Sequence, residues 1–128
     1  MSLRTPLGRV LGLGSAHEGV HHWVVQRVSA VALIVLTLWF VLSLVRLPLG
    51  DHAQVIAWMA EGIHPVLLAL LVLTAAWHSK LGVQVVIEDY VHQRHAKMAL
   101  LIVNTFAHVL VAATAVLAVL RVALRSFA

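Results

Sequence analysis

The sequence predicts an all-α protein that crosses a membrane three times, and its composition and apolar patterning carry this prediction. Of 128 residues, 62% are hydrophobic and 11% are charged, whereas soluble domains average about 45–50% and about 25%. A domain of this length cannot bury so much apolar surface in one core. Three apolar stretches are long enough to cross a hydrocarbon layer of roughly 30 Å as helices. Strands would leave unpaired backbone edges in lipid, which favours helices.

The same composition excludes several classes of protein. The absence of cysteine excludes a disulfide scaffold, a thiolate metal site and a cysteine nucleophile of the chain's own. High hydrophobicity with little charge excludes intrinsic disorder. The net charge is +4, but the basic residues flank apolar stretches, as in membrane proteins, so we expect no nucleic-acid partner. No catalytic triad, phosphate loop or HExxH motif is present, which indicates a subunit that is not catalytic alone.

The first span is predicted over residues 22–46. Its apolar part covers residues 28–45, and its polar interruptions are Ser29, Thr37 and Ser43. The preceding segment, residues 1–21, is polar and glycine-dotted, and the apolar stretch begins too late and runs too long for a cleavable signal peptide. After the span, the breaker cluster PLGD at 48–51 leads into a mildly polar piece that allows a short interfacial helix.

The second span is predicted over residues 64–89 and the third over 97–121. Pro65 suits the first turn of a helix, and the chain from 66 to 77 is almost entirely aliphatic. The polar interruptions of the third span are Asn104, Thr105, His108 and Thr114. The whole chain therefore forms a single membrane-anchor domain.

Lysine and arginine residues predict the orientation of the spans. One side carries Arg4, Arg9, Arg27, Lys80, Arg94 and Lys97. The opposite side carries Arg46, Arg121 and Arg125. Because cytoplasmic loops carry the excess of positive charge, we expect a cytoplasmic N-terminus and a periplasmic C-terminus.

His78 lies inside the second span, where ionisable groups are expensive and often functional. At 100° per residue, Gly82 is about 40° and Asp89 about 20° away from His78 around the helix. A neutral imidazole can ligate haem iron, and a glycine one turn away leaves room for a porphyrin edge. The alternative is that His78 hydrogen-bonds to a neighbouring helix and Gly82 permits close helix packing.

Glu88, Asp89 and Tyr90 end this span at the predicted cytoplasmic boundary. A tyrosine hydroxyl beside a carboxylate can hydrogen-bond a quinone carbonyl and assist proton delivery. On this pattern alone, however, we favour an ordinary interfacial tyrosine.

Other polar residues have simpler interpretations. Arg27, near the start of the first span beside His21 and His22, can pair with carboxylates, although a snorkelling arginine is commoner. For His108 we expect an interhelical hydrogen bond rather than metal ligation. We expect the remaining histidines to be solvated: His17, His52, His64, His92 and His95.

Two segments resemble a known family. The segment HSKLGVQVVIEDY at 78–90 is similar to the signature of the succinate dehydrogenase hydrophobic membrane anchor subunit, the smaller cytochrome b556-associated anchor of respiratory complex II. The segment GSAHEGVHHWVVQRVSAVA at 14–32 resembles that family's first-helix start. The resemblance covers roughly residues 9–97.

This resemblance implies site residues and partners. His78 matches the axial ligand of haem b, Tyr90 the tyrosine that hydrogen-bonds ubiquinone, Asp89 the adjacent acid, and Arg27 a basic residue near the haem propionates and the quinone pocket. It implies a second anchor subunit that supplies the other axial histidine and completes a haem-binding helical bundle. It further implies a flavoprotein and an iron–sulfur subunit, held on the cytoplasmic face of a bacterial inner membrane.

Two other functions stay open at this point. One is an anchor of a quinol:fumarate reductase, which runs the reaction in reverse. The other is a haem-free scaffold or transporter subunit.

Overall fold

The structure is a computed structural model that describes residues 16–125. Four helices follow one another in this part of the chain: α2 (Ala16–Arg46), α3 (His52–Ala60), α4 (His64–Tyr90) and α5 (Arg94–Arg125). Three of them, over Gly19–Arg46, His64–Tyr90 and Arg94–Leu124, are long and apolar enough to cross a membrane. The predicted all-α fold with three spans is therefore confirmed, and the short helix allowed after the first span is present as α3.

The long helices extend beyond the predicted ends of the spans. The first begins at Ala16 rather than residue 22, and the third runs from Arg94 to Arg125 rather than from 97 to 121. Arginine and lysine have good helix propensity, and their apolar stems follow the helix while the charged head reaches water. At the two ends of α5, where Arg94 and Arg125 lie, basic residues thus end an apolar stretch without ending the helix. This reason does not apply to residues 16–21 of α2, which contain no lysine or arginine. Of the predicted N-terminal segment, residues 1–15 lie outside the described residues.

The helices end where the sequence supplies a reason. Pro48 and Gly50 follow α2, and proline cannot continue a helix. Asp51 caps α3, since its carboxylate accepts hydrogen bonds from the backbone N–H groups of Ala53 and Gln54. Gly62 has a positive φ of 54°, a conformation that glycine adopts without strain, and it turns the chain from α3 into α4.

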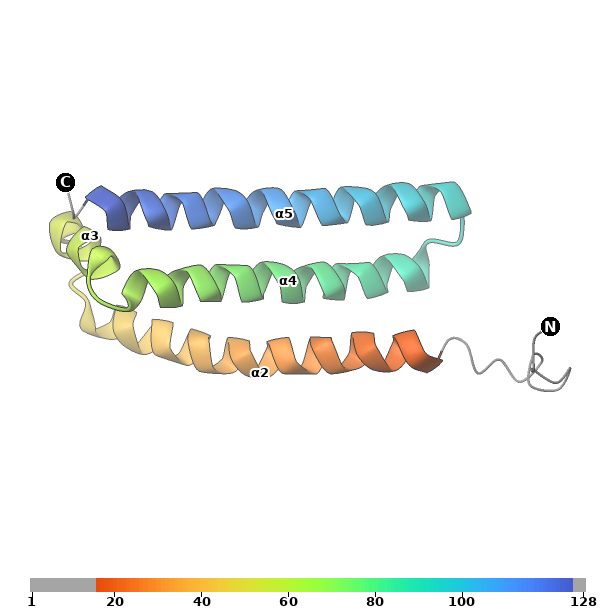
Figure 1. Cartoon of the computed structure of the whole chain (residues 1–128), viewed down its shortest axis with the longest axis horizontal. Coiled ribbons are helices and arrows are strands. Elements are labelled where there is room, and N and C mark those ends of the chain that lie inside the picture. The colour runs from red at the N-terminus through yellow and green to blue at the C-terminus, as the bar shows by residue number, and fades with distance from the viewer. Residues whose placement is uncertain (1–15, 126–128) are drawn as a thin grey trace, which may run out of the picture.

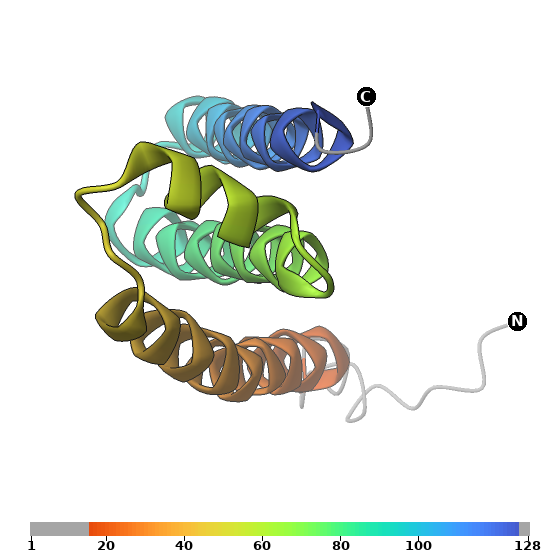
Figure 2. The same cartoon turned by 90° about the vertical axis from the view of Figure 1, so that its left-hand side faces the viewer.

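The three long helices lie side by side in an open row (Figures 1 and 2), with α4 between α2 and α5. Helix α4 contacts both neighbours, whereas within the described residues α2 and α5 make no contact. Helix α3 lies across one end, against α4 and α5. Because only 6% of the apolar stretch of α2 is buried, compared with 11% for α4 and α5, α2 is the least covered helix. Contacts between the long helices therefore lie on the two faces of α4, one toward α2 and one toward α5.

Candidate functional site

His78 lies on the face of α4 that packs against α2, and polar side chains of α2 meet it there. The Oγ atom of Ser29 is 2.9 Å from His78 Nδ1, and Nε2 of Gln26 is 3.5 Å from His78 Nε2. Ser29 is 8% exposed and is one of the few buried polar residues of the described chain. In an apolar setting such groups are retained when they hydrogen-bond to one another, so Ser29 and Gln26 form a polar contact around the predicted ligand.

Gly82 lies one turn beyond His78, on the same side of α4. A Cβ atom built on Gly82 would meet only the amide nitrogen of Gln26, at 3.8 Å, which is an ordinary contact distance. The bare backbone of α4 is thus covered by a side chain of α2 rather than by another backbone. The hydrogen bond between His78 and Ser29 is the interhelical bond that the alternative interpretation of His78 expects. Contact with another backbone does not require a glycine at position 82.

Two buried polar atoms at this contact lack a hydrogen-bond partner within the described residues: Nε2 of His22 and Oε1 of Gln26. An unsatisfied buried polar atom costs about 1–3 kcal/mol, and native structures contain few of them. Both atoms belong to the α2 face that also carries Ser29. Residues 22, 26 and 29 follow the i, i+4, i+7 spacing of one helical face. This face is therefore suited to a polar ligand that supplies the missing partners.

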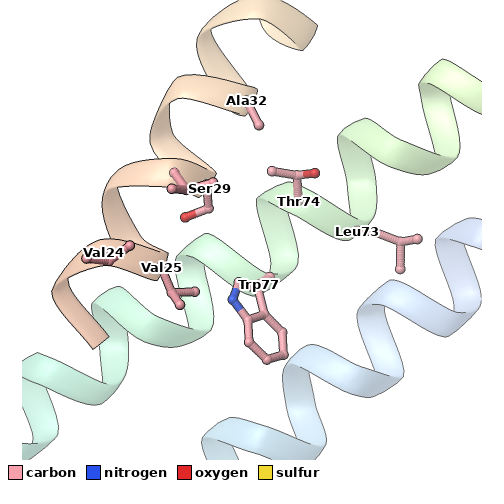
Figure 3. A pocket seen from close by; sticks show the side chains of 8 residues that line it. Val24, Val25, Ser29, Ala32, Leu73, Thr74 and Trp77 are labelled. Carbon is pink, nitrogen blue, oxygen red and sulfur yellow. The ribbon is translucent and has the colours of Figure 1, made fainter. Parts of the chain in front are cut away.

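A groove of about 550 Å³ runs beside Ser29 between α2 and α4. Figure 3 shows its lining, with Val24, Val25, Ser29 and Ala32 from α2 and Leu73, Thr74 and Trp77 from α4. The walls are almost entirely apolar, and the polar groups of the lining side chains are the hydroxyls of Ser29 and Thr74 and the indole N–H of Trp77 (Figure 3). A flat, largely apolar ligand suits such a groove.

The predicted quinone residues lie at one end of the molecule. Tyr90, the last residue of α4, is 78% exposed, and Asp89 is exposed beside it. Arg27 is also exposed, and its guanidinium lies 5.5 Å from the centroid of the Trp23 ring. The N-terminal end of α2 and the C-terminal end of α4 lie at the same end of the row (Figure 1). Tyr90 and Asp89 therefore lie at this end of the molecule, whereas Arg27, two residues before Ser29, lies closer to the level of His78. No hydrogen bond joins Arg27 to Tyr90 among the described residues.

The opposite face of α4 carries a second polar cluster, which includes His108. Nδ1 of His108 is 2.8 Å from the carbonyl oxygen of Asn104 in its own helix, and Nε2 is 3.1 Å from Ser79 Oγ. Asn104, 7% exposed, donates from Nδ2 to the carbonyl oxygen of Lys80 at 3.0 Å. Both ring nitrogens of His108 therefore have partners, and the interhelical bond expected for His108 is present. Its position supports a structural role rather than ligation.

An aromatic cluster at the α3 end was missed by the sequence reasoning. The rings of Trp39, Trp58 and His64 stack, with centroids 4.8 Å apart for Trp58 and His64 and about 6 Å apart for the other pairs. His64 Nδ1 donates to the carbonyl oxygen of Trp58 at 2.8 Å. The expectation that His64 is solvated is wrong, because α3 folds back over this end and carries Trp58 onto the ring. No local pattern signals such a contact.

Within residues 16–125, no three His, Cys, Asp or Glu side chains converge as a metal site would require. A metal held at His78 would therefore need its further ligands from a cofactor and from another chain. An iron porphyrin would meet this condition, because it would bring ring nitrogens of its own and could take a histidine from each of two chains.

Comparisons with known proteins give the family. Residues 1–119 match the model of the succinate dehydrogenase/fumarate reductase transmembrane subunit. The chain is 36% identical over 110 residues to the succinate dehydrogenase hydrophobic membrane anchor subunit of Paracoccus denitrificans. The aligned residues cover 85% of this chain and 84% of the relative. It is 32% identical over 99 residues to the subunit of the same name from Rickettsia bellii, covering 77% and 79%.

No solved structure matches the chain significantly. The family match spans most of the chain, and both relatives bear the name that the motif at 78–90 predicts. The chain therefore belongs to the succinate dehydrogenase/fumarate reductase transmembrane subunit family, as a multi-pass membrane anchor subunit of succinate dehydrogenase.

Proposed function

We propose that this anchor contributes one axial ligand of haem b, through His78, and part of a ubiquinone site, through Tyr90 and Asp89. The observation that carries the proposal is the setting of His78. Its Nε2 atom has one hydrogen-bonding contact among the described residues, to the Gln26 amide at 3.5 Å, and Gly82 adds no side chain one turn away. His108, by contrast, has both nitrogens engaged.

The residues around His78 fit a haem group. The groove beside Ser29 adjoins the α2–α4 contact, with neither His78 nor Gly82 among its lining residues, and the partnerless Nε2 of His22 lies on the same face of α2. When bound there, haem supplies a one-electron redox centre inside the membrane. This chain offers one histidine, so the second axial ligand comes from a second anchor subunit. Arg27, exposed at the start of the membrane region, is suited to pair with a haem propionate or to lie near the quinone.

The complex attaches its catalytic subunits to the membrane through this chain and its partner anchor. A flavoprotein subunit oxidises succinate, and an iron–sulfur subunit passes the electrons to ubiquinone at the membrane boundary. Both subunits lie on the cytoplasmic side of a bacterial inner membrane. Tyr90 and Asp89 lie at the C-terminal end of α4, which is at the same end of the row as the start of α2 (Figure 1). This position supports the arrangement, because protons for quinone reduction enter from the adjoining water.

The haem ligand is tested by spectroscopy of the purified complex. We expect a low-spin bis-histidine haem b in the parent complex and its loss or marked perturbation in His78→Ala. His108→Ala serves as the matched control, because His108 also lies within a predicted span but has both ring nitrogens in hydrogen bonds. An unchanged haem spectrum in His78→Ala would exclude the assignment. A colourless complex without co-purifying flavoprotein would favour the haem-free scaffold.

The quinone role is tested with Tyr90→Phe. Because the side chain is exposed, this substitution removes the hydroxyl with little effect on folding. We expect slower reduction of ubiquinone with unchanged succinate oxidation by a soluble dye. An equal loss of both activities would indicate a structural role. The quinone that the cells make distinguishes a succinate dehydrogenase from a fumarate reductase working in reverse.

A further inference from the structure

Ser29 donates its only hydroxyl proton within its own helix. Its Oγ atom lies 3.0 Å from the carbonyl oxygen of Gln26, and a carbonyl oxygen can only accept. The same Oγ atom lies 2.9 Å from Nδ1 of His78. Since a serine hydroxyl has one proton and two lone pairs, Ser29 accepts a hydrogen bond from His78. This contact therefore places the proton of the His78 ring on Nδ1.

The neighbour on the other side of the ring agrees with this assignment. Nε2 of Gln26, which can only donate, faces His78 Nε2 at 3.5 Å. This contact is compatible with a lone pair on Nε2. The Ser29 hydrogen bonds therefore carry the assignment of the tautomer, with hydrogen on Nδ1 and a lone pair on Nε2.

The hydrogen-bond partner of Nδ1 comes from another helix in His78 but from the same helix in His108. In His108 the Nδ1 atom bonds the carbonyl oxygen of Asn104 within its own helix, at 2.8 Å. In His78 the corresponding partner comes from α2. The orientation of the His78 ring therefore depends on how α2 and α4 pack, and Ser29, 8% exposed, is the residue that transmits this packing to the ring.

We infer that Ser29 is a positioning residue for haem ligation, which holds His78 in the Nδ1–H tautomer and leaves Nε2 as the iron-binding atom. The inference rests on the proposed role of His78 as a haem ligand. Ligating histidines generally donate their other N–H to an acceptor, which orients the ring and raises its basicity. Ser29 Oγ is that acceptor. The Gln26 amide lies against Nε2 and would have to move aside for iron to bind there.

The test uses the assembled, purified complex with Ser29→Ala, Ser29→Thr and Ser43→Ala. Ser43 is the matched control, because it also lies on α2 and donates to a backbone carbonyl of its own helix, that of Trp39 at 2.8 Å, but has no hydrogen bond to a histidine among the described residues. The readouts are the haem content per complex, the apparent Kd for haem, the midpoint potential of the haem, and succinate oxidation with a soluble dye as the measure of assembly.

For Ser29→Ala we expect the Kd for haem to rise about tenfold or more, the range typical of lost outer hydrogen bonds to metal ligands. We also expect a higher midpoint potential, because a less basic imidazole stabilises ferric iron less. Ser29→Thr retains the hydroxyl and should restore both values. Ser43→Ala should match the parent complex.

Two outcomes separate this inference from the proposed function. If His78→Ala abolishes the haem spectrum but Ser29→Ala leaves affinity and potential unchanged, Ser29 has no positioning role and the inference fails alone. If His78→Ala leaves the spectrum unchanged, His78 is not the ligand and both fail. A loss of affinity in Ser29→Ala that Ser29→Thr does not restore, with potential unchanged, would indicate a packing effect and would also overturn the inference.

Discussion

Gly82 offers the simplest test of ligand fit at the scale of one residue. A Cβ atom there would meet the Gln26 amide nitrogen at 3.8 Å, so Gly82→Ala introduces no clash in the chain itself. Alanine is favoured over glycine in a helix by about 1 kcal/mol. The substitution should therefore leave the free energy of unfolding equal or higher.

In the assembled complex, Gly82→Ala should nevertheless weaken haem binding. An added methyl group in a filled site costs about 1–3 kcal/mol, which corresponds to a rise in the Kd for haem of about fivefold to about 150-fold. Haem content and Kd, measured by absorption, check this. Gly19→Ala is the control, since a Cβ there meets nothing within 4 Å. Undiminished haem affinity in Gly82→Ala would contradict a porphyrin edge at this position.

Helices α4 and α5 are joined by a side-chain bond that predicts a stability effect at the scale of elements. Asn104 of α5 donates to the Lys80 carbonyl oxygen of α4 at 3.0 Å. Asn104→Leu removes this bond while keeping bulk, and we expect the free energy of unfolding in detergent to fall by about 0.6–2 kcal/mol, the range for interhelical bonds in membranes.

Thr105→Val is the control for Asn104→Leu. Thr105 is the next residue and donates within its own helix, to the Leu101 carbonyl oxygen at 2.9 Å. Thr105→Val should therefore lower the free energy of unfolding less than Asn104→Leu does. Equal effects in the two variants would show that the Asn104 bond does not join the helices energetically. Unfolding followed by circular dichroism in mixed detergent micelles provides the comparison.

Helix α3 depends on the charge of its cap, which predicts a pH effect. Hydrogen bonds from the backbone and side chain of Gln54, together with the N–H of Ala53, lower the pKa of Asp51 below its ordinary value. A carboxyl whose pKa is lowered by folding stabilises the fold above its unfolded pKa of about 3.9. This stabilisation is lost as the pH falls through the lowered value.

We therefore expect the first turn of α3 to fray under acid conditions, with faster exchange of the Ala53 and Gln54 amide protons once intrinsic exchange rates are corrected for pH. Asp51→Asn keeps a good helix cap without a titrating group, so its corrected rates should not change over the same pH range. Identical pH profiles in the two proteins would show that the Asp51 charge does not hold the turn.

The orientation of the whole molecule in the membrane follows from charge and is testable with single cysteines, because the chain has none of its own. Arg94 and Lys97 begin α5 at the end where α2 also begins, and the excess of positive charge predicts that this end is cytoplasmic. Gly50 lies in the loop at the opposite end, and a side chain there meets nothing within 4 Å.

We expect a membrane-impermeant thiol reagent to label Gly50→Cys in spheroplasts and to label Gln93→Cys only after the membrane is opened. Gln93 is exposed between α4 and α5, so both sites are accessible once the reagent reaches them. The reversed pattern would place the predicted quinone residues at the periplasmic boundary and would exclude electron arrival from cytoplasmic subunits.

The sequence by itself determined the number of spans, their approximate positions and the family. Hydropathy and length fix where helices cross a bilayer, because the lipid core demands apolar stretches of a set length. The grouping of His78, Gly82 and Asp89 on one side of α4 also follows from helical geometry alone. The motif at 78–90 indicated the family that the relatives confirm.

Only the tertiary structure decided which side chains meet across helices. Helix α2 is apolar on nearly all sides, so no amphipathic pattern tells which face turns toward α4. Packing set that rotation and brought Ser29 and Gln26 to His78. The spacing of residues 22, 26 and 29 was a signal that sequence reasoning could have used. The stacking of His64 with Trp58 had no such signal in the sequence. The path of a short connecting helix is set by contacts between residues that come together only when the chain folds.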